Sequence, residues 1–461
     1  MANCCSGKPI DSNQIELQMK SILKLFFALF TILFGNQTVS SQEWTLKQCI
    51  DTALVKNKSI QLSKNNHTIS EERWKESKAN LLPKIGLNAE YKYFTDLPTQ
   101  LMPLSTFNPS APDGQFKEAQ FGVPHNINAS IQLLVPLYNP QLYGAINATE
   151  LANQLNQLQT TKVEEQLAFD IANMYYSAQI IYSQIEFIDS NLINSQKVLS
   201  RVQKLHEQSL SKGTDVQKMA LQIQQLSNQK NQLTAKHVQL LNALKFAIGL
   251  PQEMDFQTVQ TIQYETSIEL ENKPIIELQL NSLQQQLQLN ELKTLNHSRF
   301  LPNLNLIANY GTMGLGYDQQ PSNFLNFYPI GFAAVQFSYP LFSGTQTLRK
   351  INQKQFELQN TQLQRLILEE QNAMQIRNAK QQRSNTLETI ATSKEQITFA
   401  QTIYQQTQLQ YSLGSASLTE VLLADNALRE AQQTYLTAII DYLKATLELT
   451  KLTGNNLLSN H

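Results

Sequence analysis

The strongest constraint on the fold is residues 140–249, where apolar residues recur every three or four positions along two very long stretches. The first stretch has them at Ile171, Met174, Ala178, Ile181, Ile185, Ile188 and Leu192, and the second at Val216, Met219, Ile223, Leu226, Leu233, Leu240 and Leu244. This period predicts helices packed along a seam. Between Pro140 and Lys212 the only helix-breaking residue is Gly144, at the very start of the stretch. A helix of roughly 70 residues can therefore form, with a length on the order of 100 Å. The break at residues 209–215 predicts a helical hairpin.

The second half of the chain repeats the first. A second hairpin is predicted over residues 345–452, with its break at Gly414. Val135-Pro136-Leu137 recurs 204 residues later as Tyr339-Pro340-Leu341, and Gly249 recurs 205 residues later as Gly454. A repeat of this size predicts two copies of one structural unit. We therefore divide the chain into a first repeat, residues 42–250, a connector, residues 251–273, a second repeat, residues 274–454, and a tail, residues 455–461.

Each repeat also contains two stretches in which apolar and polar residues alternate, which predicts β-strands. They span about residues 84–94 and 126–135, then 303–313 and 330–339, and each ends near a proline. Strands of roughly ten residues suit a tilted transmembrane strand. Four strands cannot close a barrel within one chain, and open edges cannot lie in lipid, so several copies would have to combine. The alternative is a soluble β-sandwich with one wet face.

An apolar segment at residues 22–34 begins beside Lys20 and Lys24. It is too short for a membrane-spanning helix and has the length of a signal-peptide core. We expect a leader over residues 1–41, in which the signal peptide is about residues 19–41 and residues 1–18 are an upstream extension. The alternative is a buried core helix. Cys49 is the only cysteine after this leader, so we expect no internal disulfide and no lipid anchor.

The sequence shows no constellation for catalysis. The net charge of -1 argues against a nucleic-acid partner, and the 6 histidines lack metal-ligand spacing. The glycine-rich segment at residues 311–316 follows a strand but opens a loop, which is not the context of a phosphate-binding turn. We therefore expect no enzyme activity, no cofactor and no bound metal.

Several segments together resemble the TolC-type outer-membrane efflux proteins, also called outer membrane factors. They are residues 44–54 (WTLKQCIDTAL), Leu82-Pro83, Leu301-Pro302, residues 340–344 (PLFSG) and residues 414–422 (GSASLTEVL). The resemblance implies an α+β fold, in which a duplicated unit has two transmembrane β-strands and long antiparallel coiled-coil helices. It also implies a homotrimer in the outer membrane of a Gram-negative bacterium. Its β-barrel would continue as a periplasmic α-helical barrel, with residues 251–273 at an equatorial belt.

The resemblance further implies a passive exit duct of a tripartite efflux or type I secretion system. Its partners would be a periplasmic adaptor (membrane fusion protein), an inner-membrane pump of the RND or ABC type, and outer-membrane lipid. The alternative is an exported coiled-coil structural or spacer protein without transport activity, although a spacer has no need of the four alternating strands.

The hairpin tips carry the candidate functional residues. Tyr411, Gly414 and Glu420 match family positions for a constricting tyrosine, a turn glycine and an acidic gate residue. The 205-residue offset pairs Asp215 with Glu420 and Ser209 with Gly414, and Asp425 lies on the same seam as Glu420. Gly213 comes four residues after Ser209, so the sequence leaves open which of the two makes the first turn. Charged rings on a threefold axis favour cations. The competing explanation is that Glu420 only stabilises the start of its helix.

Two family positions differ here. The family's best-known member has an aspartate where Leu423 stands and an arginine where Ala416 stands. The candidate residues for docking an adaptor are the small residues at the two tips: Gly213, Thr214, Gly414, Ser415, Ala416 and Ser417. The alternative explanation for these small residues is that each tip is simply a tight turn.

Overall fold

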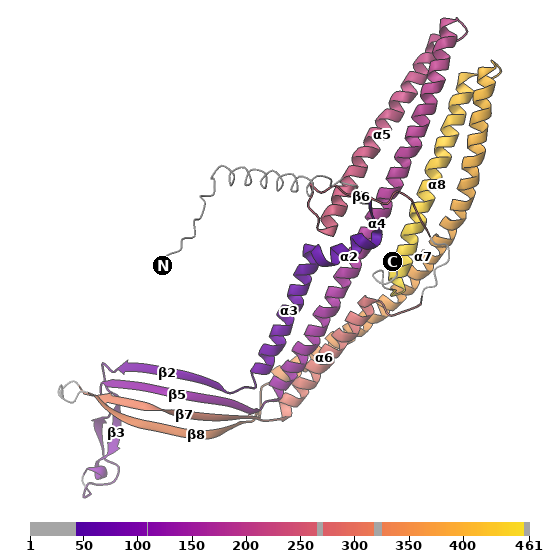
Figure 1. The fold of residues 1–461 in the computed structure, drawn as a ribbon. Helices are drawn as coiled ribbons and strands as arrows, with labels where there is room; N and C mark the ends of the chain where they lie inside the picture. Colours follow the sequence, from indigo (N-terminus) through magenta and orange to yellow (C-terminus); the bar gives the residue numbers. More distant parts are fainter. Residues whose placement is uncertain (1–42, 108, 265–270, 318–324, 456–461) are drawn as a thin grey trace, which may run out of the picture.

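The computed structural model describes residues 43–107, 109–264, 271–317 and 325–455. They form an elongated molecule in which long helices fill one end and a four-stranded sheet extends from the other (Figure 1). The predicted leader and most of the predicted tail lie outside the described residues.

The duplication predicted from the sequence is visible in the order of the elements. After α2 (Leu46–Lys56), the first unit contains α3 (Lys58–Ala79), β2 (Lys84–Tyr93), β5 (His125–Tyr138), α4 (Pro140–Glu207) and α5 (Gly213–Ile248). The second contains α6 (Ile276–Phe300), β7 (Asn303–Gly316), β8 (Leu325–Ser338), α7 (Gln346–Ser412) and α8 (Leu418–Leu452). The predicted α+β fold with a duplicated strand-and-hairpin unit is confirmed.

Local chemistry sets where these helices begin. Asn139 precedes α4 and its side chain accepts hydrogen bonds from the backbone N–H groups of Gln141 and Leu142, while Pro140 occupies the first turn, where no N–H is needed. Asn57 separates α2 from α3. Its side chain caps α3 through the N–H of Ser59 at 2.7 Å and donates to the carbonyl of Ala247 at 2.7 Å, which fixes the corner against α5.

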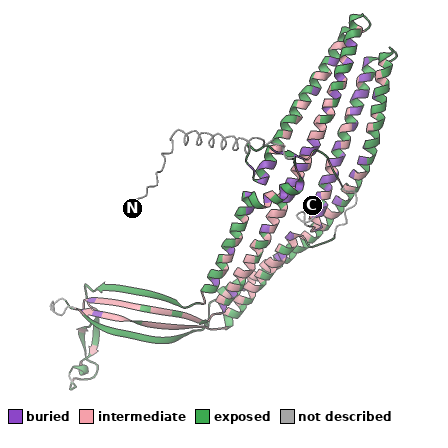
Figure 2. Cartoon of the chain, viewed as in Figure 1, coloured by how far each residue is buried: buried purple, intermediate pink, exposed green. Residues whose placement is uncertain are grey.

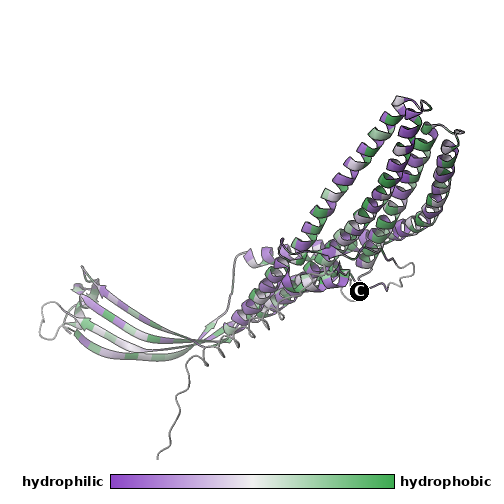
Figure 3. Cartoon of the chain, turned by 45° about the horizontal axis from the view of Figure 1, so that its top comes forward, coloured by the Kyte–Doolittle hydropathy of each residue, from purple (hydrophilic) through white to green (hydrophobic). Residues whose placement is uncertain are grey.

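The four long strands form an antiparallel sheet in the order β2-β5-β7-β8. The register aligns the apolar faces predicted from the sequence, so that one row across the sheet reads Ile85, Leu133, Ala308 and Ala333. Figure 3 shows the alternation of hydropathy along the strands. The outer edges of β2 and β8 have no partner strand among the described residues.

Three of these strands are longer than the roughly ten residues expected, because β5, β7 and β8 each have 14. The predicted end of β5 at Pro136 was too early, and the predicted start of β8 at about residue 330 was too late. β5 continues beyond Pro136 with an irregular register against β7, and β8 contains Pro329. β8 is an edge strand, where a residue without an N–H is tolerated.

Two further pairings were not anticipated. The loop at residues 95–125 contains a short antiparallel hairpin of β3 (Thr99–Pro103) and β4 (Phe116–Gln120). The connector contributes β6 (Gln257–Thr258), which pairs in parallel with β1 (Glu43–Trp44).

Buried side chains concentrate in the helices, whereas in the sheet the edge strands β2 and β8 are exposed and the inner strands β5 and β7 are mostly half-buried (Figure 2). One cluster lies around α2, where Cys49 and Ile50 pack against Ile171 of α4 and Leu244 of α5. A second, which we call the tip cluster, joins all four hairpin helices and consists of Val198, Val202, Met219, Tyr404, Leu418, Val421, Ala424 and Leu428. Across the described part of the chain, no helix combines the length and apolar character needed to cross a membrane.

Both hairpins end on a glycine with a left-handed backbone. Gly249 has φ +85° and Gly454 has φ +67°. Each lies against the backbone that leads into the first helix of its own unit, α3 or α6. A Cβ on Gly249 would lie 2.8 Å from the carbonyl oxygen of Lys56, and one on Gly454 would lie 2.6 Å from that of Lys273. The recurrence of glycine therefore reflects both its φ and a close backbone approach.

Candidate gate at the helical tips

The two hairpin tips are built alike. α4 is followed by Ser209 with φ +58°, and α7 is followed by Gly414 with φ +76°. Beyond each, an N–H reaches back to a helical carbonyl, from Leu210 to Leu205 at 2.8 Å and from Ser415 to Gln410 at 3.0 Å, as in a Schellman cap. Ser209 therefore occupies the position of Gly414, as the 205-residue offset indicates, and Gly213 is instead the first residue of α5.

At the second tip, Ser417 and Glu420 form a reciprocal cap at the start of α8. The Glu420 N–H donates to Ser417 Oγ at 3.3 Å, and the Ser417 N–H donates to Glu420 Oε2 at 2.6 Å. The Glu420 side chain is exposed. This geometry supports the helix-start explanation and also leaves the carboxylate at the tip surface.

At the first tip, Lys212 precedes α5 and makes no side-chain cap. Asp215, the counterpart of Glu420, instead accepts from Ser211 Oγ at 3.5 Å and pairs with Lys218 at 3.6 Å. A negative charge in the first turn of α5 favours the helix through its dipole.

Tyr411 brings the two tips together. It is half-buried against the tip cluster and interacts with Ser211 and Asp215 of the other hairpin. Burial raises the pKa of its phenol, Asp215 adds to that rise, and the hydrogen bond with Ser211 opposes it. The structure thus joins the sequence candidates Tyr411 and Asp215.

Asp425 lies deeper, on α8 beside the tip cluster, and only 3% of it is exposed. Its Oδ2 accepts a hydrogen bond from Gln222 Nε2 of α5 at 2.5 Å and lies 3.1 Å from Arg429 Nε. Its Oδ1 is buried without a hydrogen-bond partner among the described residues. Burial raises the pKa of Asp425, while Arg429 and Gln222 oppose that rise.

The remaining candidates lie at the surface of the tips. Gly213, Thr214, Gly414, Ser415 and Ser417 are exposed, and Ala416 is half-buried. Leu423, where the family's best-known member has an aspartate, is 63% exposed. Sequence reasoning missed Gln222 and Ser211, because their contacts with Asp425 and Tyr411 run between hairpins and leave no periodic signal. It also missed Arg429, although the four-residue spacing from Asp425 on α8 could have indicated that ion pair. Among the described residues, no group of three or more His, Cys, Asp or Glu side chains could hold a metal ion.

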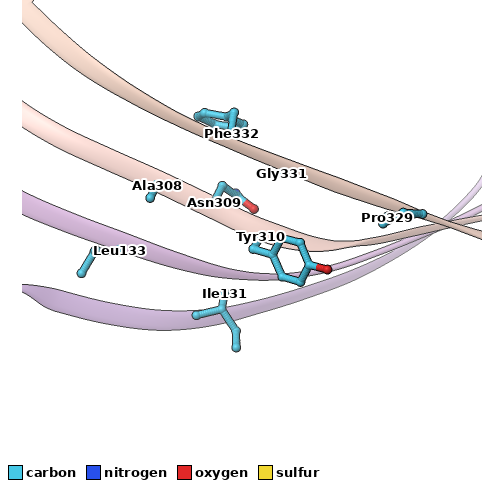
Figure 4. A pocket seen from close by; sticks show the side chains of 8 residues that line it. All are labelled: Ile131, Leu133, Ala308, Asn309, Tyr310, Pro329, Gly331 and Phe332. Carbon is cyan, nitrogen blue, oxygen red and sulfur yellow. The ribbon is translucent and has the colours of Figure 1, made fainter.

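The other exposed feature is the apolar face of the sheet. Figure 4 shows the side chains that line a shallow depression here, where Ile131 and Tyr310 lie together on one side of the sheet and Phe332 lies on the other. The Tyr310 ring covers Gly331 of β8, where an added Cβ would lie 2.9 Å from the ring. Ile85 and Leu87 on β2 are 74% and 75% exposed. A contiguous apolar band of this kind suits contact with lipid.

The fold and this band together define the class of duct-forming outer-membrane proteins. A sequence model of the outer membrane efflux protein family matches residues 49–250 and 277–455. The chain therefore belongs to the outer membrane efflux protein family. It is an outer-membrane exit duct for efflux, as the sequence predicted, rather than an enzyme or a spacer.

Individual relatives agree with this assignment. Outer membrane protein TolC of Salmonella enteritidis is 20% identical over 457 residues, covering 95% of this chain and 87% of that protein. TolC of Escherichia coli (strain K12) is 20% identical over 461 residues, with the same two coverages. The crystal structure of CusC superposes with a TM-score of 0.75 at 15% identity, over 89% of this chain and 92% of that one. VceC from Vibrio cholerae gives 0.71 at 14% identity, over 89% and 96%.

Proposed function

We propose that three copies of this chain close one continuous duct, whose sheet end forms a twelve-stranded barrel and whose helical tips form the gate. The observation that carries this proposal is that the outer edges of β2 and β8 have no partner strand in the described part of the chain. Open edges are not stable in lipid, so they must pair with other copies. Neighbouring strands within the sheet are antiparallel, so β8 of one copy and β2 of the next would continue the same pattern.

The helices support the same assembly. α7 exposes several large apolar side chains along its length, among them Leu363, Ile367, Phe399 and Ile403 at 55–65%. A single copy leaves these side chains in water, whereas packing against the helices of neighbouring copies would bury them.

At the gate, threefold symmetry would place three copies each of Asp215, Tyr411 and Glu420 around the axis. Converging carboxylates repel one another and favour cations in the opening. Hydrogen bonding within its own helix cap fixes the Glu420 carboxylate at the tip, where it can contribute to such a ring. The exposed small residues at the tips would let a periplasmic adaptor approach closely, and the adaptor would connect the duct to an inner-membrane pump of the RND or ABC type.

The test is reconstitution of the purified protein into planar bilayers. We expect discrete conductance steps and a particle mass of three chains in detergent. Glu420→Gln should lower cation selectivity, whereas Asp189→Asn, in an exposed ion pair with Lys230 farther along α4, should leave it unchanged. A silent bilayer would overturn the duct, and unchanged selectivity in Glu420→Gln would remove Glu420 from the gate.

For the docking role, cysteines at Ser415 and Thr214 should crosslink in cells to an adaptor encoded near this gene. Crosslinking that fails at both positions, in cells where efflux is intact, would refute docking through these tips.

A further inference from the structure

A buried charged residue, Asp425, lies beside the tip cluster. Asp425 is nine-tenths buried or more and stands beside Ala424 and Leu428 of the cluster. Its bond to Gln222 joins α8 of the second hairpin to α5 of the first. The Asp425 carboxylate therefore links the first hairpin to the second inside the tip region.

All four hairpin helices contribute to the surroundings of the Asp425 carboxylate. α5 contributes the neutral Gln222, α8 contributes Arg429, and α7 contributes the Tyr404 phenol, whose pKa is raised mainly by burial and further by Asp425. α4 faces the cluster with the apolar Val198 and Val202. Arg429 donates its hydrogen bond to Asn426 and meets Asp425 as an ion pair, while its buried Nε has no hydrogen-bond partner among the described residues.

This environment leaves the ionised carboxylate incompletely solvated. Oδ2 accepts one hydrogen bond, from Gln222, and has the charge of Arg429 nearby, whereas Oδ1 is buried and has no donor among the described residues. Burying a charge without filling its acceptor sites is unfavourable, and water would fill them if the hairpins moved apart. Apolar contacts in the tip cluster therefore favour the closed tips, while the ionised Asp425 favours separation.

We propose that Asp425, held between Gln222 and Arg429, is a proton-operated latch: its neutral form keeps the two hairpin tips together, and its ionised form favours their separation. This inference rests on the proposed gate, whose regulation it describes. Asp425 acts through the position of the hairpins and has no need to contact the transported substrate.

The direction of the pH effect follows from linkage. Burial raises the pKa of Asp425 in the closed tips, and hydration in separated tips returns it toward the ordinary value. The closed state therefore binds the proton more tightly, so closure is favoured at low pH and lost as pH rises through the two pKa values. Each unit of difference between them changes the closed-to-open ratio about tenfold for each chain.

The experiment uses the assembled full-length protein and a buried reporter. In a Cys49→Ala background, Met219→Cys places a thiol inside the tip cluster, where Met219 is 2% exposed. Its labelling rate by a thiosulfonate is divided by that of Leu210→Cys, which is 73% exposed, so that the pH dependence of the reagent cancels. We expect this ratio to increase severalfold between pH 5 and pH 8, together with channel opening in bilayers.

Asp425→Asn keeps the shape and the acceptor for Gln222 but removes ionisation, so the ratio should become low and independent of pH. Asp189→Asn is the matched control and should behave as the parent protein. Gln222→Met removes the bond between the hairpins and should increase the ratio at pH 8. An unchanged pH dependence in Asp425→Asn, or no pH dependence in the parent, would refute the latch. If the latch is refuted but the protein still conducts in bilayers, the proposed duct is unaffected. If labelling depends on pH but the protein never conducts, only the proposed duct is refuted.

Discussion

Replacement of Gly249 by alanine should destabilise the junction between α5 and α3 far more than the same change at Gly414. Both glycines have a left-handed backbone, with φ +85° and +76°. Alanine in that conformation costs about 1–2 kcal/mol. At Gly414 nothing lies within 4 Å of an added Cβ, so this is the whole cost. At Gly249 the added Cβ would lie 2.8 Å from the Lys56 carbonyl oxygen, which is backbone and cannot rotate away.

To relieve the contact between the new Cβ and the Lys56 carbonyl oxygen, the corner between α2 and α3 has to shift. Asn57 holds this corner in place by its hydrogen bond to the Ala247 carbonyl. Overpacking of this kind costs about 1–3 kcal/mol more, giving roughly 2–5 kcal/mol at Gly249 against roughly 1–2 kcal/mol at Gly414. Gly454→Ala should resemble Gly249→Ala, because its Cβ would lie 2.6 Å from the Lys273 carbonyl oxygen.

Hydrogen–deuterium exchange measures this locally. Amides in the last turn of α5 and the first turn of α3 should exchange faster in Gly249→Ala by the factor that corresponds to 2–5 kcal/mol, on the order of 30-fold or more. The tip amides of Gly414→Ala serve as the matched control and should change by about 5- to 30-fold. Equal effects at the two sites would show that the Lys56 contact carries no energy and would refute the reasoning.

Three further outcomes are expected. Ser417→Ala should cost about 1 kcal/mol through loss of the α8 cap, seen as faster amide exchange confined to the second tip, and exchange that spreads along α8 would contradict it. Cys49 is buried and its pKa is raised to about 12, so the folded protein should not react with maleimide at pH 8, and reaction before unfolding would contradict that burial. Gly311→Ala should reduce the yield of heat-modifiable oligomer on gels, because its Cβ would meet the Ala129 carbonyl oxygen at 2.2 Å, whereas Gly331→Ala meets only a mobile exposed ring; equal yields would contradict this.

The helical hairpins and the duplication could be predicted because their physical causes are local and periodic. The spacing of Ile171, Ala178 and Ile188 is set by the helix itself, and the buried state of all three agrees with it. The strand ends could not be predicted in the same way. A proline ends a strand only at a position where the sheet needs a backbone N–H, which proline lacks. Pro136 lies beside the irregular register and Pro329 lies on the edge strand, and neither position has that need.

The candidate site likewise has one part that the sequence could predict and one part that it could not. The positions of Tyr411 and Glu420 at the second tip followed from resemblance. At the first tip the 205-residue offset paired Ser209 with Gly414, but Gly213 competed for the turn, and the backbone of Ser209 decides between them. The bond from Gln222 to Asp425 could not be foreseen, since seam periodicity shows which residues face inward but does not specify which helix of the other hairpin they meet.

The strand order has a consequence for how the molecule assembles. Each helical hairpin joins residues that are close in the chain, so it can form early. The contact between β5 and β7 instead pairs His125 with Gly316, and it must wait for both repeats to be made. Closure of the outer edges must wait longer, because it needs other chains. We therefore expect the helical part to mature first and the sheet to be the slow step, so that the half-finished sheet is the stage at which the chain most needs protection from aggregation.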